Sequence, residues 1–271
     1  SVMPGGMVRM AAPEVSTAAV LPNGHGSKDL WITAEAPERR PASILQATIP
    51  TVHLRRTGRD LLSRTADNLY WLGRYVERAE SQMRLLRSVL SRLLEDGRPE
   101  NDPTVLRRLL ATELAKGPEL PASVVPGWGE IEYLAGVLML EQRDYGLRES
   151  LAEVHRTATL ARDQISQDAW RMLTQLHIDR RWRQARQKLP TSQALDLLDD
   201  GIRVLNAFAG TEAENMTRNW AWRFLEMGRR IERATQLVEL IRELVIRPPE
   251  PDRSSDLRLL LELADSFMTY R

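Results

Sequence analysis

The chain has 271 residues, and its 42% hydrophobic content is enough for one large domain, or two modest ones, with a real core. Its 38 lysines and arginines are balanced by 37 aspartates and glutamates, so the net charge of +1 argues against a nucleic-acid binder that works by bulk positive charge. The absence of cysteine excludes disulfides, thiolate metal sites and a thiol nucleophile.

The basic residues are unevenly divided, because Lys28, Lys116 and Lys188 are lysines and the rest are arginine. Codon bias explains most of such an excess, but arginine also has the planar fork that pairs well with carboxylates. We find no run near the roughly 18 apolar residues of a membrane span, and no basic start with an apolar block as in a signal peptide. We therefore expect a soluble cytoplasmic protein without a membrane partner.

Residues 1–56 differ from the rest of the chain in their content of helix-breaking residues. Six prolines and the pairs Gly5-Gly6 and Gly24-x-Gly26 break this segment so often that useful helices cannot form. Short strands are expected near 7–11 and 30–33. So small a segment cannot bury a core alone, and we predict an irregular, strand-poor leader.

From about residue 57 the pattern becomes helical. Apolar residues between Leu69 and Leu93 alternate at spacings of three and four, which is typical of a helix in a bundle. Ser63 or Thr65 is the expected N-cap, and Asp96-Gly97 the end. The remaining pattern predicts an all-α, multi-helix bundle, with helices at 103–115, 128–141, 147–188, 192–208, 217–247 (capped by Thr217) and from 254.

One motif occurs twice. Gly73-Arg74-x-x-Glu77-Arg78-Ala79 recurs 155 positions later as Gly228-Arg229-x-x-Glu232-Arg233-Ala234. The apolar spacing around the first copy is repeated around the second, which makes chance an unlikely source. This internal pseudo-repeat predicts two related helices in comparable places of one bundle.

The repeated motif places charge opposite the apolar face of its helix. Side chains lean toward the helix N-terminus, so Glu77 leans over Gly73, which leaves room for another helix, a water molecule or a ligand. Arg74 can pair with Glu77 along the helix, and such a carboxylate stays ionised with a lowered pKa. Two interpretations follow: a buried charge network that holds two helices in register, or a pocket that grips a carboxylate, a phosphate or an amine.

No catalytic residue can be assigned from the sequence. The Glu-x-x-His pairs of di-metal bundles are missing, as are the P-loop and the nucleophile elbow, so we predict no metal site. The candidate ligand-binding residues are those of the two motifs and their polar neighbours: Arg74, Glu77, Arg78, Arg229, Glu232, Arg233, Asn68, Trp71, Asn215 and Arg218.

The run from Ser63 to Glu80, SRTADNLYWLGRYVERAE, resembles the opening of the bacterial α-E family of helical domains. Segments 165–170 and 208–234 resemble later blocks of that family, in the same order. Segment 266–271 resembles a block that more helices follow in the family. The resemblance implies that residues 57–271 are an α-E domain, truncated at its C-terminus.

The leader resembles another family. Val2-Met3-Pro4-Gly5-Gly6 followed by residues 26–31 is similar to the end of a circularly permuted ATP-grasp domain, whose members are ATP-dependent carboxylate–amine ligases or are predicted to be. The resemblance implies that residues 1–56 are the tail of such a domain plus a linker. It places Lys28 in a nucleotide site that is incomplete here, and assigns ATP and Mg to the associated domain, with no cofactor in this chain.

Together the two resemblances suggest the helical accessory module of an ATP-grasp peptide or amide ligase. Its partners would be the ligase domain and a peptide or amino-acid-like substrate; self-association of the chain stays open. One alternative is a catalytic α-E domain that acts on the ligase product. Another is a purely structural interaction module, which predicts that Glu77 and Glu232 are buried and paired with no adjoining pocket.

Overall fold

The computed structural model describes residues 5–9, 27–31, 61–95, 103–118, 127–184, 189–246 and 254–270. By its internal contacts the chain divides into two compact units, Ser1–Arg56 and Thr57–Arg271.

In the first unit, β1 (Gly5–Arg9) pairs with β2 (Ser27–Trp31) in an antiparallel ribbon. Gly5 lies opposite Trp31, and Val8 lies opposite Lys28. The two expected strands are therefore present, each starting two or three residues earlier than predicted. Residues 2–4 and Gly26 of the leader motif lie outside the described residues.

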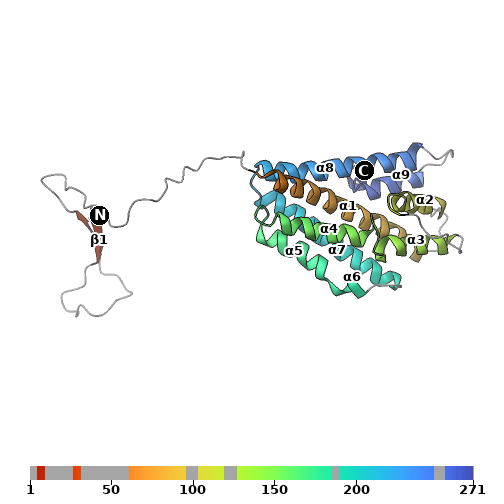
Figure 1. Ribbon diagram of the computed structural model, residues 1–271, viewed down its shortest axis with the longest axis horizontal. Coiled ribbons are helices and arrows are strands. Elements are labelled where there is room, and N and C mark those ends of the chain that lie inside the picture. The colour runs from red at the N-terminus through yellow and green to blue at the C-terminus, as the bar shows by residue number, and fades with distance from the viewer. Residues whose placement is uncertain are drawn as a thin grey trace. The chain divides into compact units, whose positions relative to one another are not determined.

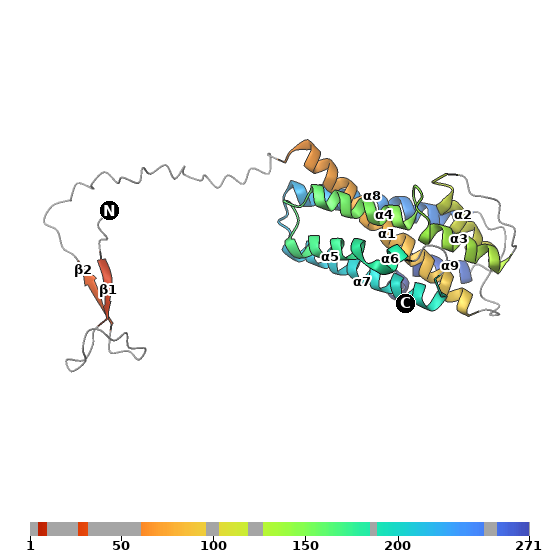
Figure 2. The ribbon, with the colours of Figure 1, turned by 60° about the horizontal axis from the view of Figure 1, so that its bottom comes forward.

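The second unit is a helical bundle, which confirms the all-α prediction (Figures 1 and 2). Its helices are α1 (Ser63–Leu94), α2 (Pro103–Leu114), α3 (Trp128–Leu140), α4 (Leu147–Leu160), α5 (Gln167–Ile178), α6 (Arg180–Gln184), α7 (Thr191–Asn215), α8 (Trp220–Ile241), the π-helical turn η1 (Arg242–Ile246), α9 (Ser254–Leu263) and α10 (Phe267–Tyr270).

Helix α1 is the centre of the bundle. Its apolar face, including Leu72, Val76 and Met83, has no solvent exposure, and α1 packs against both α4 and α7. A second face of α1, with Gly73 and Glu77, is buried as well, and α8 is the helix that contacts it. In Figure 1, α8 forms one edge of the bundle and α5, α6 and α7 form the opposite edge, with α1 and α4 between.

The predicted single helix 147–188 is wrong, because the chain turns between α4 and α5. Helix α4 ends at Leu160, and the hydroxyl of Ser166 caps the start of α5 by accepting a hydrogen bond from Ala169 N (3.1 Å). Helices α4 and α5 then pack against each other. The segment contains no proline or glycine, so the break depends on the serine N-cap and on burial of the two apolar faces.

Other helix boundaries also differ from the prediction. Helix α1 begins after Leu62 with no side-chain cap, so neither Ser63 nor Thr65 has the predicted role. Helix α8 is capped by Asn219, whose Oδ1 accepts from Trp222 N (3.2 Å), and not by Thr217. Helix α7 runs on to Asn215, past the predicted end at 208, because small and polar residues there do not interrupt it.

Candidate functional site

Two glycines let α1 and α8 cross with their backbones in contact. A Cβ atom on Gly73 would lie 2.2 Å from the carbonyl oxygen of Leu225, and one on Gly228 would lie 2.0 Å from that of Tyr70. These glycines occupy the same position in the two motif copies. Each one contacts backbone atoms of the opposite helix that lie within four residues of the other glycine. The repeat therefore forms one contact within the molecule, in which each copy packs against the other.

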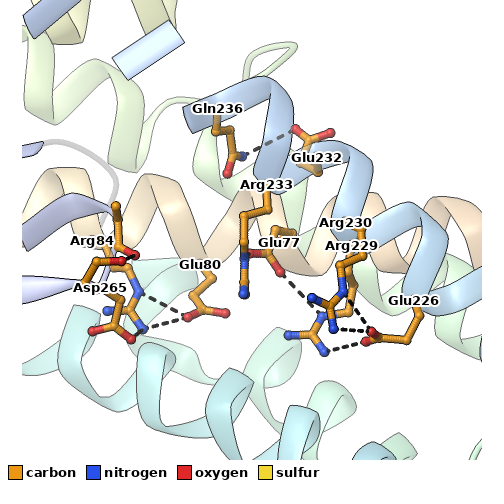
Figure 3. Close-up of polar contacts among 12 residues, drawn as sticks. Glu77, Glu80, Arg84, Glu226, Arg229, Arg230, Glu232, Arg233, Gln236 and Asp265 are labelled. Atoms are coloured by element: carbon orange, nitrogen blue, oxygen red, sulfur yellow. Dashed lines mark hydrogen bonds and ion pairs between the residues drawn. The ribbon is translucent and has the colours of Figure 1, made fainter. Parts of the chain in front are cut away.

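The charged residues of the two copies bind each other across this crossing. The Glu232 carboxylate accepts hydrogen bonds from Nε of Arg74 and from Nε of Arg78 (2.8 Å). The Glu77 carboxylate accepts one from Nε of Arg233 (2.5 Å), and Nε of Arg229 lies 3.4 Å from its Oε2. Figure 3 shows Arg233 reaching Glu77 from the opposite helix.

The pairing is reciprocal, because Arg229 and Arg233 are the second-copy equivalents of Arg74 and Arg78. Each glutamate is held by the same two arginine positions of the other copy. The predicted pairing of Arg74 with Glu77 along one helix is therefore wrong, since Arg74 reaches across to Glu232 instead. Of the two interpretations of the motif, the geometry matches the network that holds two helices in register.

Burial and pairing determine the charge of Glu232. Glu77 and Glu232 are each 5% exposed. Burial works to raise the pKa of Glu232, but hydrogen bonds and charge from Arg78 and Arg74 outweigh it, so the pKa is lowered. The hydrogen bond to Glu77 raises the pKa of Arg233. Glu232 thus stays ionised, which suits an ion pair and not a general acid.

The second half of the network carries extra carboxylates. Nη1 of Arg229 lies 3.3 Å from Glu212 of α7 and 3.1 Å from Glu226 of α8. Figure 3 shows the side chains of Arg229 and Arg230 both reaching the carboxylate of Glu226. Arg74, the equivalent of Arg229, instead donates to the Tyr70 hydroxyl (2.8 Å). The ion pairs between the two motif copies are therefore reciprocal, but the further partners of Arg229 and Arg74 differ.

Glu212 was missed by the sequence analysis, since one glutamate near the end of a helix gives no signal of its own. It is 4% exposed, and burial raises its pKa to about 7 although the charge of Arg229 opposes the rise. Gln82 was missed for the same reason. It is 2% exposed and donates to Glu113 and to the Tyr145 carbonyl, while it accepts from Ser150.

A pH dependence of stability follows from Glu212. Its folded pKa of about 7 lies above the usual 4.5, so between these values the folded chain holds a proton that the unfolded chain has lost. The free energy of unfolding should fall as pH rises from 4.5 through 7 and level off by about pH 8, where the folded carboxyl group has lost its proton too. Glu212→Gln should remove this loss and stabilise the protein at pH 8 by on the order of 2 kcal/mol.

Urea unfolding at pH 5 and pH 8 measures this effect. The matched control is Glu214→Gln, which changes an exposed glutamate two positions away on α7. The control should keep the pH dependence of the wild type. An unchanged pH dependence in Glu212→Gln would show that Glu212 is not its source.

The remaining candidate residues take no part in the ion pairs between the two motif copies. Asn68 is half-buried on α1, and Trp71 is 37% exposed and stacks on Tyr75 (5.6 Å between ring centroids). Asn215 is exposed at the end of α7. Arg218 is exposed, donates to the Ala213 carbonyl, and lies over the Trp222 ring (4.2 Å). Lys28 lies in β2, in the other unit.

Four cavities among the described residues have no motif side chain in their walls. One cavity of about 360 Å³ lies between α1, α3 and α7. Its walls are mainly apolar, with two glutamates at α3, and include Leu90, Glu132, Tyr133, Leu140, Glu141 and Ala194. Within the described part of the chain no three His, Asp or Glu side chains gather as a metal site would require. Each described helix is too short or too polar to cross a bilayer.

Comparison with known proteins gives one family. Residues 61–271 match Alpha-E, described as "a predicted alpha-helical domain with a conserved ER motif". Two proteins of Mycobacterium tuberculosis strains and one of Mycobacterium bovis, all named as uncharacterized, are each 24% identical over 294 aligned residues. The alignment covers 99% of this chain and 32% of theirs, so the chain spans about a third of these relatives' length. No solved structure matches the chain.

Proposed function

Because the chain belongs to the Alpha-E family, we propose that it is a non-catalytic helical interaction module whose paired Glu-Arg motifs hold α1 against α8. The observation that supports this role is that each motif glutamate is buried and held by two arginines of the opposite helix. Arginines engaged in this way would have to leave a buried carboxylate uncompensated before they could grip a ligand.

The module would serve an ATP-grasp carboxylate–amine ligase, as the resemblance of the leader suggests. ATP and Mg would bind to that ligase domain, with Lys28 as a member of its nucleotide site. The helical module would position the ligase or its peptide or amino-acid-like substrate through its outer surfaces. The motif arginines would contribute only by keeping the bundle in shape.

A catalytic α-E domain is the second candidate, and it is less well supported. General acid–base catalysis works best with a group whose pKa lies near the operating pH. The pKa of Glu232 is lowered by its arginines, which suits a permanent anion. The pKa of Glu212, about 7, is closer to the value that acid–base catalysis needs. The residue is only 4% exposed, however, and borders only a cavity of about 10 Å³.

The variants Arg78→Ala and Arg233→Ala separate these roles. Titration calorimetry would measure their affinity for a recombinant circularly permuted ATP-grasp protein, and for a synthetic glutamate-rich peptide, at a temperature where circular dichroism shows both variants folded. We expect lower melting temperatures with affinities within twofold of the wild type. A tenfold loss of affinity at full stability would instead identify a ligand site, and ligase-product turnover abolished by Glu77→Gln would identify an enzyme.

A further inference from the structure

Helix α8 has two apolar faces, and only one of them is covered by α1. The inner face, with Ala221, Leu225 and Gly228, is buried. The outer face carries Met227, Ile231, Ala234 and Val238, at spacings of four, three and four. Met227 is 43% exposed, Ile231 40% and Val238 64%, and Ala234 is exposed too. Such a stripe is typical of a helix that packs against another helix.

The repeat shows what the same stripe does elsewhere in this molecule. Its equivalents on α1, at the offset of 155, are Leu72, Val76, Ala79 and Met83. All four have no solvent exposure, because α4 and α7 pack against α1. The prediction that the two helices occupy comparable places is therefore wrong on this face: the stripe is core on α1 and surface on α8.

The most exposed charges on α8 are positive, while Glu239 beside the stripe is 35% exposed and pairs with Lys116. The side chains of Arg230, Arg233 and Arg242 are 75%, 57% and 60% exposed. The carboxylates of Glu226 and Glu232 on the same helix have side-chain exposures of 16% and 6%, and Glu226 pairs with Arg230 (3.0 Å). A partner that covers the stripe would therefore meet arginines at its margins.

On α1 the equivalent positions are satisfied by carboxylates from the covering helices. Arg87 of α1, the equivalent of Arg242, pairs with Asp199 of α7 (3.0 Å). Tyr75 of α1, the equivalent of Arg230, interacts with Glu153 of α4. The helices that cover the first stripe thus supply both an apolar seam and acidic flanks.

We propose that the outer face of α8, defined by Met227, Ile231, Ala234 and Val238, docks an amphipathic helix with acidic flanks, packed as α7 packs on α1. The carboxylates of that helix pair with Arg230 and Arg242, in addition to Glu226 and Glu243 of this chain, and its apolar seam covers the stripe. A second copy of α8 fits less well, because it would bring the same arginines to the contact. This inference rests on the proposed role as an interaction module and names the chemistry of its partner.

The probe that tests this surface is a fluorescein-labelled synthetic peptide with the sequence of residues 191–215. This segment already forms the acidic helix that packs on α1, and it carries Asp196, Asp199 and Asp200. Fluorescence anisotropy would measure its binding to the full chain. We expect saturable binding, weakened at least tenfold by Val238→Glu and by the double change Arg230→Glu and Arg242→Glu.

The controls place the same changes on another exposed helix. Ile178→Glu and Arg171→Glu alter exposed residues of α5 and should leave the affinity within twofold of the wild type. A peptide with Asp199→Asn and Asp200→Asn should bind at least fivefold more weakly than the parent. Thermal unfolding followed by circular dichroism confirms that each variant is folded.

Three results would overturn the proposal. The first is that the peptide fails to bind, or binds the wild type and the α8 variants equally. The second is a dimer in sedimentation that Val238→Glu dissociates, which would make a second copy the occupant. The third is binding of the chain to phosphatidylglycerol vesicles that Val238→Glu abolishes, which would make the face a membrane contact. None of these measurements involves the ligase. A result that overturns the docking proposal can therefore be told apart from one that overturns the proposed function.

Discussion

Gly228→Ala is expected to destabilise the helical unit by about 3 kcal/mol or more. The added methyl group would lie 2.0 Å from the Tyr70 carbonyl oxygen and 3.1 Å from Arg74 N, and both are backbone atoms of α1 that no rotamer change can move. The helices would have to separate, which would also lengthen the ion pairs around Glu77 and Glu232. Gly73→Ala should act similarly, because its methyl group would lie 2.2 Å from the Leu225 carbonyl oxygen.

Urea unfolding at neutral pH measures this effect, and Gly210→Ala is its control. Gly210 lies inside α7, and a methyl group there would have no neighbour within 4 Å. Since alanine favours a helix more than glycine does, this control should gain about 0.5–1 kcal/mol. Equal effects of Gly210→Ala and Gly228→Ala would mean that the crossing tolerates a side chain, against the geometry described above.

Glu232→Ala should cost about 3–5 kcal/mol of stability, because it leaves Arg74 and Arg78 partly buried without their carboxylate. Glu232→Gln keeps the shape of the side chain and should cost nearly as much, since the charge is what the two arginines need. Asp168→Asn removes an exposed partner of Arg171 and should change stability by less than about 0.5 kcal/mol.

The double variant Glu232→Ala with Arg78→Ala tests whether these residues act as one network. Its loss should be smaller than the sum of the two single losses, since the second change removes a charge that the first left unpaired. Strict additivity, measured by urea unfolding, would show that Arg78 and Glu232 contribute independently.

The sequence predicted the repeat and the room above Gly73, but not which helix would fill it. Alternating apolar spacings identify a helix and its buried face, and a glycine beneath a glutamate shows that something can approach closely. Whether that neighbour is a ligand, a water molecule or the other copy depends on how the helices assemble. The pairing of Arg74 with Glu232 over 158 positions was therefore beyond local pattern reasoning.

The same limit explains the errors on α4, α5 and α8. Between α4 and α5 the apolar spacing continues and no strong breaker intervenes, so the turn at Ser166 left only a weak capping signal. The outer stripe of α8 has the same apolar spacing as the stripe of α1, yet Val238 is 64% exposed where Met83 is buried. Periodicity identifies a face that can be covered, and tertiary packing decides whether it is.

The distance along the chain between the two motif copies has a consequence for how the protein folds during synthesis. Ribosomes release the chain from its N-terminus, and Glu77 is separated from Arg233 by 156 positions. Until α8 emerges, the face of α1 that carries Gly73 and Glu77 has no helix to cover it. Closing so long a loop is entropically costly and slow, so we expect the α1–α8 contact to form late, after α1 has already packed on α4.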